Sequence, residues 1–215
     1  MITIDSELPK NLKTATLAVG WFWTPDAKFG IVDGVIRTRV GYCGGTTVNP
    51  TYNNIGDYAE TFEFDYDGDK ITYEEIINGF WDSHTPENKT GIAQYRSIIF
   101  YRTDEERIIA ENSKRDFEKA LGISFNTEII PLSKFYLAEN YHQKYYLQKA
   151  SILMKELADK YSSFKEFINS TLSCKLNSYC KGHGTIAMLK NDIHKFELND
   201  ISKRVLFDIV EGYGK

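Results

Sequence analysis

A strict two-residue alternation between residues 58 and 66 constrains the fold of this chain more than any other feature. Aromatic side chains and one carboxyl group share one face of this segment, and small or charged side chains share the other. The first face carries Tyr58, Glu60, Phe62, Phe64 and Tyr66. The pattern predicts a strand whose aromatic face packs against a core, with the carboxyl group of Glu60 inside that face.

The segments around this strand predict an α+β fold. Apolar or alternating runs indicate strands, and capped amphipathic runs indicate helices. Strands are predicted over residues 14–19, 35–42, 58–66 and 95–101, and helices over residues 24–30 and 72–84. Thr24 is the expected cap of the first helix, with Pro25 at its first position. The order β-α-β-β-α-β is that of a ferredoxin-like split βαβ unit, an antiparallel sheet with its helices on one side.

The rest of the chain predicts one compact domain and an extension. The domain, residues 1–150, is completed by a helix over residues 103–121, a strand over 127–132 and a helix over 138–148. The extension, residues 151–215, has a weaker pattern that is mostly helical. We therefore expect added C-terminal helices beside the domain.

Composition excludes several classes of protein. Apolar residues make up 42% of the chain and charged residues 26%, which is ordinary for a globular protein and not for a fibrous or disordered one. The net charge of -4 and the absence of a run of Lys or Arg argue against nucleic acid and anionic membranes as partners. Without a secretory signal or membrane-spanning stretch, and with only 3 cysteines, the sequence predicts a cytoplasmic protein with free thiols.

A set of short motifs follows in a fixed order along the chain. They are Gly20-Trp21-Phe22-Trp23, Thr38-Arg39-Val40-Gly41-Tyr42, Asn49-Pro50-Thr51-Tyr52, the segment from Gly56 to Glu60, and Gln94-Tyr95-Arg96-Ser97. Each motif is weak alone, but the ordered set resembles the peptide methionine sulfoxide reductase A family over residues 12–150. Residues 170–184 are similar to the tail of a longer subgroup of that family. The family has Gly-Cys-Phe-Trp at a strand-to-helix junction, so Trp21 stands at the position of the nucleophilic cysteine.

The resemblance implies a reductase for the S sulfoxide of methionine that needs no metal and no bound cofactor. In such enzymes a cysteine thiolate attacks the sulfoxide sulfur and becomes a sulfenic acid, which a second thiol and an external reductant such as thioredoxin reduce. By this resemblance Glu60 is the proton donor, Tyr52 and Tyr95 are hydrogen-bonding tyrosines, and Phe22 and Trp23 cradle the methionine methyl group. The residue pattern agrees, because a carboxyl group among aromatic side chains is poorly solvated and keeps its proton.

Position 21 leaves two interpretations. In the first, the protein is a working reductase whose codon 21 is UGA, which specifies selenocysteine but is printed as Trp under another code. In the second, Trp21 is the true residue and the chain is a catalytically inactive relative that binds methionine or methionine sulfoxide. An indole offers no anion comparable to a thiolate at neutral pH and cannot become a sulfenic acid.

The cysteines leave further alternatives. Cys43 follows a strand in a glycine-rich turn and is a candidate substitute nucleophile. Cys174 and Cys180 are candidates for resolving an oxidised intermediate, or else small apolar residues of a core. Together with His183 they make only part of a metal site, so no metal is expected.

Overall fold

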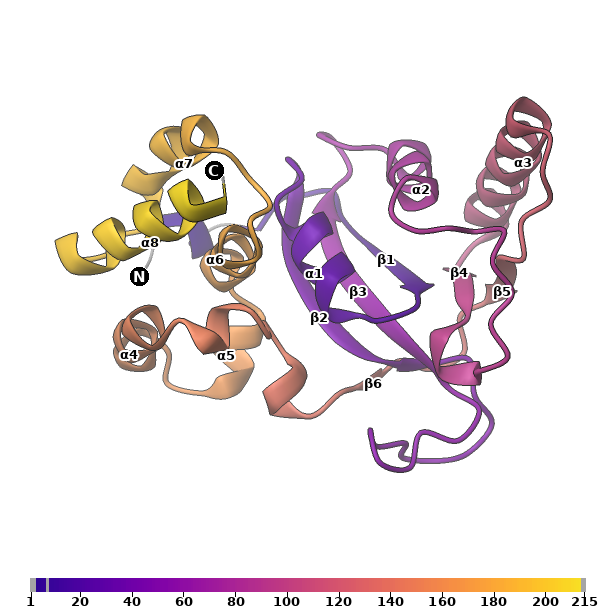
Figure 1. Cartoon of the computed structure of the whole chain (residues 1–215), viewed down its shortest axis with the longest axis horizontal. Helices are drawn as coiled ribbons and strands as arrows, with labels where there is room; N and C mark the ends of the chain where they lie inside the picture. Colours follow the sequence, from indigo (N-terminus) through magenta and orange to yellow (C-terminus); the bar gives the residue numbers. More distant parts are fainter. Residues whose placement is uncertain (1–2, 7, 214–215) are drawn as a thin grey trace.

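The computed structural model describes residues 3–6 and 8–213. A six-stranded sheet forms its centre, in the order β5-β4-β1-β3-β2-β6 (Figure 1). Its strands are β1 (Leu12–Val19), β2 (Val35–Cys43), β3 (Ala59–Asp67), β4 (Ser97–Tyr101), β5 (Glu128–Pro131) and β6 (Tyr136–Leu137). The predicted aromatic strand is β3, which lies next to β1 in the middle of the sheet.

Three helices pack on the face of the sheet that carries the aromatic residues of β3. They are α1 (Trp23–Gly30), α2 (Tyr73–Trp81) and α3 (Asp104–Leu121). Phe29 of α1 and Ile77 of α2 share one core with Phe62 and Phe64 of β3, both of which are fully buried. A capping box at Thr72 begins α2, as the sequence predicts. The aromatic face is therefore the core side of the sheet, and Glu60 points into it.

The α+β class is confirmed, but the sheet is mixed rather than antiparallel throughout. The neighbouring pairs among β1, β2, β3 and β4 are antiparallel, and so is the pair of β2 and β6. The exception is β5, which runs parallel to β4. Helix α3 connects these two strands and returns the chain to the same end of the sheet, as a parallel pair requires. The sequence predicts the strand but not its direction.

The first helix begins earlier than expected. It starts at Trp23, and its N-cap is Phe22 rather than Thr24. The hydroxyl of Thr24 instead lies 2.9 Å from the hydroxyl of Tyr146. Pro25 is tolerated here because the amide positions of a first helical turn have no partner within the helix.

Residues 138–148 do not form the predicted α-helix. They contain the 3₁₀ turn η3 (Asn140–His142) and the first two residues of a second, η4 (Leu147–Lys149). Between them Lys144 has a φ of 47°, in the left-handed region that interrupts a helix. The Gln143 side chain also exchanges hydrogen bonds of 3.0 and 2.8 Å with the backbone of Val40. Contacts with β2 therefore override the local helical pattern.

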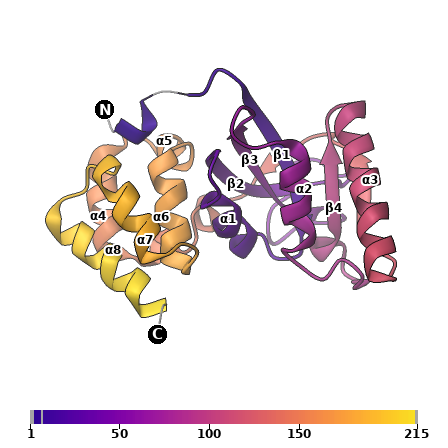
Figure 2. The ribbon, with the colours of Figure 1, turned by 90° about the horizontal axis from the view of Figure 1, so that it is seen from above.

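The C-terminal helices form a unit with its own core. They are α4 (Ser151–Lys160), α5 (Phe164–Ile168), α6 (Thr171–Lys181), α7 (Ile186–Asp192) and α8 (Asp200–Tyr213). Three further 3₁₀ turns are η1 (Thr3–Asp5), η2 (Ala93–Tyr95) and η5 (Ile193–Lys195). Leu172 and Leu176 of α6 and Leu206 of α8 are fully buried in this second core. Figures 1 and 2 show the unit beside α1, at the opposite end of the molecule from α3.

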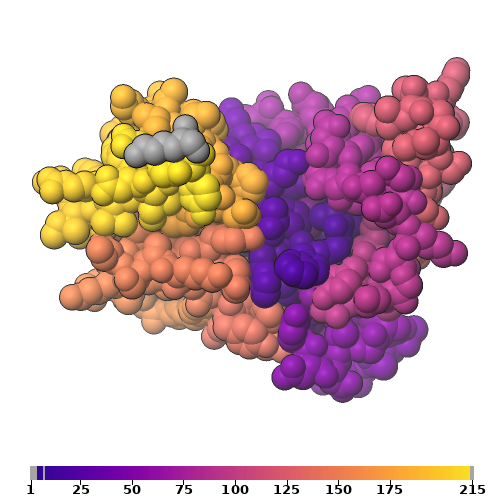
Figure 3. All heavy atoms as spheres, in the orientation of Figure 1, coloured from indigo at the N-terminus to yellow at the C-terminus, as the bar shows by residue number. Residues whose placement is uncertain are grey.

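The surface is hollowed between the C-terminal helical unit and the end of the molecule that carries α3. On the face drawn in Figure 3, the indigo segment that contains β1 and α1 reaches the surface between the orange and yellow helical unit and the magenta segments.

Within residues 3–6 and 8–213, no helix combines the length and the apolar character needed to cross a membrane.

Candidate active site

A sharp turn between β1 and α1 presents position 21. Gly20 has a φ of 98°, which residues with a side chain rarely adopt, and it turns the chain out of β1. Phe22, the N-cap of α1, makes no side-chain hydrogen bond to the first helical turn. Trp21 is 62% exposed, whereas Phe22 is 1% exposed. Position 21 therefore lies at the uncapped N-terminal end of a helix, where the helix dipole stabilises an anion.

The carboxyl group of Glu60 lies beside this turn. Its Oε2 accepts a hydrogen bond from the backbone N–H of Phe22 at 3.2 Å, and its Oε1 accepts one from the Gln94 side chain at 2.6 Å. Glu60 is only 3% exposed. Burial raises the pKa of its carboxyl group, and the two hydrogen bonds offset only part of this rise. A carboxyl group biased toward its protonated form therefore adjoins the residue that follows position 21.

Stacked and packed rings lie beside the turn on the α1 side. We call this group the aromatic wall; its members are Phe22, Trp23, His142 and Tyr145. The ring of Trp23 stacks on that of Tyr145, with centroids 4.0 Å apart and planes within 5°. Its Nε1–H donates to Nδ1 of His142 at 3.1 Å, so the proton of the neutral imidazole is on Nε2. Burial lowers the pKa of His142, although the charge of Glu139 opposes this effect. Phe22 packs on the same imidazole, at 5.1 Å between centroids.

Tyr52 reaches the wall from the long loop between β2 and β3. Its ring lies 4.6 Å from that of His142. Glu139 anchors it, because one carboxylate oxygen accepts the Tyr52 N–H at 2.9 Å and the other accepts the Tyr42 hydroxyl at 2.7 Å. Tyr42 is the register partner of Glu60 on the neighbouring strand. One carboxylate thus fixes the loop to the sheet beside the site.

Tyr95 lies beside position 21. The Trp21 ring is close to both Trp23 and Tyr95, with centroids 6.1 Å from the first and 6.4 Å from the second. Burial and the nearby charge of Glu60 raise the pKa of Tyr95, so its hydroxyl keeps its proton. The six residues predicted for the site therefore come together around one turn: Trp21, Phe22, Trp23, Tyr52, Glu60 and Tyr95.

Arg96 holds the ends of the long loop. Its Nη2 donates to the carbonyl oxygens of Gly44 at 3.2 Å and Asp57 at 3.0 Å. The Asp57 carboxylate accepts hydrogen bonds from the backbone N–H of Thr46 at 2.9 and 3.1 Å. Tyr52 lies within this loop, and the contacts of Arg96 and Asp57 close its two ends.

Helix α6 of the C-terminal unit holds α1 in place. Asn177, 1% exposed, donates to the buried carboxylate of Asp26 at 2.8 Å. The Lys175 ammonium donates to the carbonyl oxygens of Gly30 at 2.9 Å and Val32 at 3.0 Å, which satisfies the C-terminal end of α1. A Cβ atom at Gly30 would lie only 2.6 Å from Oγ of Ser178, so the two helices touch through this glycine.

The cysteines are remote from position 21 or buried. Cys43 packs with Ala59 and Phe100 in the cluster on the opposite face of the sheet, and burial raises the pKa of its thiol to about 11. This geometry contradicts the hypothesis of a substitute nucleophile at Cys43, because neighbouring residues of a strand point to opposite faces. Cys174 is buried beneath α1, where burial raises the pKa of its thiol.

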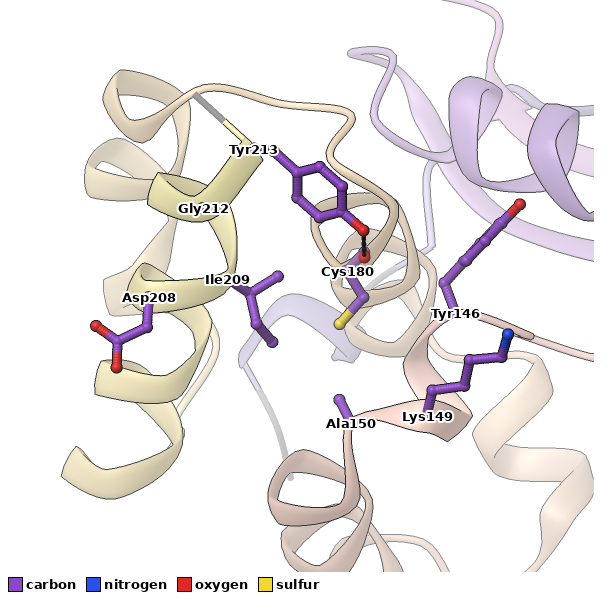
Figure 4. A pocket seen from close by; sticks show the side chains of 8 residues that line it. All are labelled: Tyr146, Lys149, Ala150, Cys180, Asp208, Ile209, Gly212 and Tyr213. Atoms are coloured by element: carbon purple, nitrogen blue, oxygen red, sulfur yellow. Dashed lines mark hydrogen bonds between the residues drawn. The ribbon is translucent and has the colours of Figure 1, made fainter. Parts of the chain in front are cut away.

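Cys180 lines a separate cavity of about 400 Å³ in the C-terminal unit. Figure 4 shows its side chain near Ile209, with the Tyr213 hydroxyl donating to the Cys180 carbonyl at 3.1 Å. Burial raises the pKa of this thiol to about 12, which makes it a weak nucleophile. Among the described residues, no group of three or more His, Cys, Asp or Glu side chains is arranged to hold a metal ion.

Sequence reasoning missed four residues that complete the site. Gln94, Glu139, His142 and Tyr145 hold Glu60, Tyr52 and Trp23 in position. Gln94 lies in one of the ordered motifs, and the other three lie in the segment AENYHQKYY, for which the sequence pattern predicts a helix and no role at the site. Glu139, His142 and Tyr145 reach Tyr52 and Trp23 because their segment folds back onto β2 instead of forming a helix.

Known proteins match this chain over the region that contains the candidate site. The family model described as peptide methionine sulfoxide reductase matches residues 13–175. A peptide methionine sulfoxide reductase of Drosophila melanogaster is 37% identical over 201 residues, which cover 92% of this chain and 80% of that protein. Mxr1 from Saccharomyces cerevisiae in reduced form has a TM-score of 0.61 at 28% identity, covering 68% of this chain and 90% of that one. Mxr1 in complex with Trx2 has a TM-score of 0.50 at 26% identity, covering 64% and 88% respectively.

Proposed function

Because this chain belongs to the peptide methionine sulfoxide reductase family, we propose that its site reduces methionine S-sulfoxide to methionine when position 21 carries a sulfur or selenium nucleophile. The observation that carries this proposal is the hydrogen bond of 3.2 Å between the backbone of Phe22 and the buried carboxyl group of Glu60. It sets a proton donor one residue from the attacking position.

The reaction balances with the groups present around the turn. The nucleophile attacks the sulfoxide sulfur, takes its oxygen, and is oxidised by two electrons to a sulfenic or selenenic acid, while the sulfoxide is reduced to a thioether. Glu60 supplies a proton to the oxygen as the sulfur–oxygen bond breaks, because burial raises the pKa of its carboxyl group and favours the form that carries the proton. The helix end stabilises the attacking anion. Phe22 and Trp23 offer aromatic surface to the methyl group.

An external dithiol reductant completes the cycle in this proposal. Because Cys43, Cys174 and Cys180 are buried, the oxidised nucleophile condenses with one thiol of an external dithiol reductant and releases water. The second thiol of the reductant then displaces the nucleophile, which restores the starting form and leaves the reductant as a disulfide. A thioredoxin-like protein fits this role, since the related Mxr1 was solved in complex with Trx2. No metal and no bound cofactor take part in these steps.

Position 21 decides whether the chain performs this reaction. We propose that codon 21 is UGA and specifies selenocysteine, because the groups that serve the reaction, Glu60 and Gln94 among them, are in place around a residue that cannot react. A UGA codon, with a selenium-containing residue at position 21 in the natural protein by mass spectrometry, is the expected result. A UGG codon would overturn this part and leave the inactive binding relative as the alternative.

The activity itself is tested with the Trp21→Cys variant. With dithiothreitol as reductant, the variant should reduce the S sulfoxide of a methionine peptide and leave the R sulfoxide unchanged, whereas the Trp21 chain should reduce neither. Absence of turnover by a folded variant would contradict the proposed function.

The organisation of the chain supports two further proposals. The domain of residues 1–150 has the strand order β4-β1-β3-β2 with antiparallel neighbours, which supports a ferredoxin-like unit extended by β5 and β6. The second proposed domain is residues 151–215, and its described part, residues 151–213, contains the helix α6 that fixes α1. The expected cytoplasmic location also stays a prediction.

A further inference from the structure

A cavity of about 540 Å³ lies between helix α5 and the end of the sheet formed by β2 and β6, and we call it the α5 cavity. Arg39 of β2 and Leu137 of β6 line it from the sheet, and Phe164 and Ile168 line it from α5. None of the six residues gathered around position 21 belongs to its lining. Its volume is within the range of small-molecule sites, roughly 300–1,000 Å³. The reaction proposed at position 21 does not account for this cavity.

Large apolar side chains from two separate parts of the chain line the α5 cavity. They are Phe135, Leu137, Phe164 and Ile168. Phe164 and Ile168 are four residues apart, which places them on the same side of α5. The ring of Phe135 lies against β2 at Gly41, where a Cβ atom would overlap it. Leu137 is 51% exposed. Apolar surface left open in a cavity of this size is suited to an apolar group of a bound molecule.

The charged side chains of the lining are both basic. They are Arg39 and Lys165, and no Asp or Glu is among the described residues that line the cavity. The chain as a whole has a net charge of -4, so a basic lining does not follow from its composition. Lys165 is exposed on α5, and its ammonium forms no ion pair with a carboxylate of the described residues. Its charge is therefore available to an anion.

The charge of Arg39 is only partly neutralised. Its guanidinium donates to the carboxylates of Glu63 at 2.7 Å and Asp65 at 3.1 Å. The same two carboxylates accept hydrogen bonds from Arg37 at 2.5 Å and Arg102 at 2.7 Å. Three guanidinium groups thus share two carboxylates, which leaves one positive charge in excess. The hydrogen bonds also hold the Arg39 side chain in place, so a fixed positive potential reaches the cavity.

We propose that the α5 cavity binds a small organic anion with an apolar body. The body packs among the four apolar side chains, and the anionic head pairs with the Lys165 ammonium within the positive potential of Arg39 and its neighbours. A free small molecule suits the cavity better than a protein partner, which would need a contact of about 1,200–2,000 Å² of total buried surface. The inference does not depend on the reaction proposed at position 21.

Calorimetric titration of the full chain with decanoate tests this inference. Two probes of the same chain length are matched controls: decan-1-ol, which has no charge, and decylammonium, which has the opposite charge. All three are used below the concentrations at which they form micelles. Decanoate should bind at least about tenfold more tightly than either control, because a charge-assisted hydrogen bond to an ammonium adds to the apolar contact. Equal dissociation constants, or no binding of decanoate, would overturn the proposal.

A charge reversal places the anionic head in the α5 cavity. Lys165→Glu changes an exposed side chain and should weaken decanoate binding by at least about tenfold, while the binding of decan-1-ol stays unchanged. Lys190→Glu makes the same change at an exposed position of α7 outside the lining, and it should leave decanoate binding intact. The proposal is wrong if Lys165→Glu has no effect on decanoate, or if both variants weaken it equally.

A second pair of variants locates the apolar body. Leu137→Ser should weaken the binding of decanoate and of decan-1-ol alike, by about threefold or more, because apolar contact is lost. Leu121→Ser is the matched change, since Leu121 is 60% exposed and ends α3, at the opposite end of the molecule (Figure 1). It should change neither affinity. Unchanged binding in Leu137→Ser would show that the probes bind elsewhere. None of these measurements uses turnover, so their outcome is separate from that of the proposed function.

Discussion

The end of the sheet around position 21 and the C-terminal helical unit use polar groups in different ways. At the sheet end, Glu60 is buried with a raised pKa and adjoins an exposed turn. In the helical unit, Asn177 and Lys175 are engaged by the backbone and side chains of neighbouring segments, and they fix α1. We infer that the residues proposed for the reaction lie at the sheet end and that the residues of α6 support the fold. Changes at the sheet end should alter rate, and changes in α6 should alter stability.

The largest expected effect follows from removing the acid at the sheet end. In the Trp21→Cys background, Glu60→Gln should lower kcat by about 10²–10⁴-fold, because the proton for the sulfoxide oxygen is lost. Steady-state kinetics with a methionine S-sulfoxide peptide measure this. A loss of less than tenfold in a folded variant would contradict the proposed division between reacting and supporting residues, because Glu60 would then be a structural residue only.

The pH dependence of stability and of the rate provides a second test of Glu60 as the acid. The folded protein holds the Glu60 proton more tightly than the unfolded chain does, because burial raises the pKa of this carboxyl group. Its contribution to stability is present below the ordinary carboxyl pKa and is lost as the pH rises through the folded pKa. The rate should fall over the same upper range, since only the protonated group donates. A rate profile lacking this fall, with the thiol fully ionised, would argue against general acid catalysis by Glu60.

The next largest effect is a loss of stability on changing a residue of α6. Asn177→Ala removes the donor to the buried Asp26 carboxylate and the acceptor for the backbone N–H groups of Tyr146 and Leu147, each at 3.1 Å. Leaving such groups unsatisfied should cost about 2–3 kcal/mol, or roughly 5–10 °C in Tm. Thermal unfolding measures this. Asn191→Ala on the exposed side of α7 is the control, with an expected change below about 0.5 kcal/mol.

A smaller effect is expected where α1 touches α6. The methyl group of Gly30→Ala would lie 2.6 Å from Oγ of Ser178 and 3.0 Å from Sγ of Cys174, so the helices must separate at a cost of about 1–3 kcal/mol. Gly79→Ala in α2 is the matched change, because no atom beyond its own stretch of helix would lie within 4 Å of the added methyl group. It should stabilise the protein by about 0.5–1 kcal/mol. Equal effects of the two changes would show that the contact between α1 and α6 is loose.

The sequence predicted which candidate residues lie together better than it predicted the segments around them. The alternation of β3 placed Glu60 on the core face, and the motif order brought Phe22, Trp23 and Tyr95 to the same turn. These features are local in the chain, or they repeat a pattern shared with a known family. The family assignment and the α+β class were therefore accessible from residues alone.

The errors came from contacts between distant segments. The parallel direction of β5 depends on how α3 crosses the sheet, and nothing in residues 127–132 encodes it. The segment with His142 has a helical pattern, yet the two hydrogen bonds that the Gln143 side chain exchanges with the backbone of Val40 shape it instead. The bracing of α1 by Asn177 joins residues 151 positions apart, so no local pattern predicts it.

A single-turnover experiment shows whether the residue at position 21 takes the sulfoxide oxygen. The Trp21→Cys variant is mixed with excess methionine S-sulfoxide peptide and no reductant, and both products are counted. We expect one methionine per protein molecule and one sulfenic acid at the introduced thiol, captured by a 1,3-diketone. Formation of no methionine by the folded variant, or of methionine without oxidation of that thiol, would contradict this expectation.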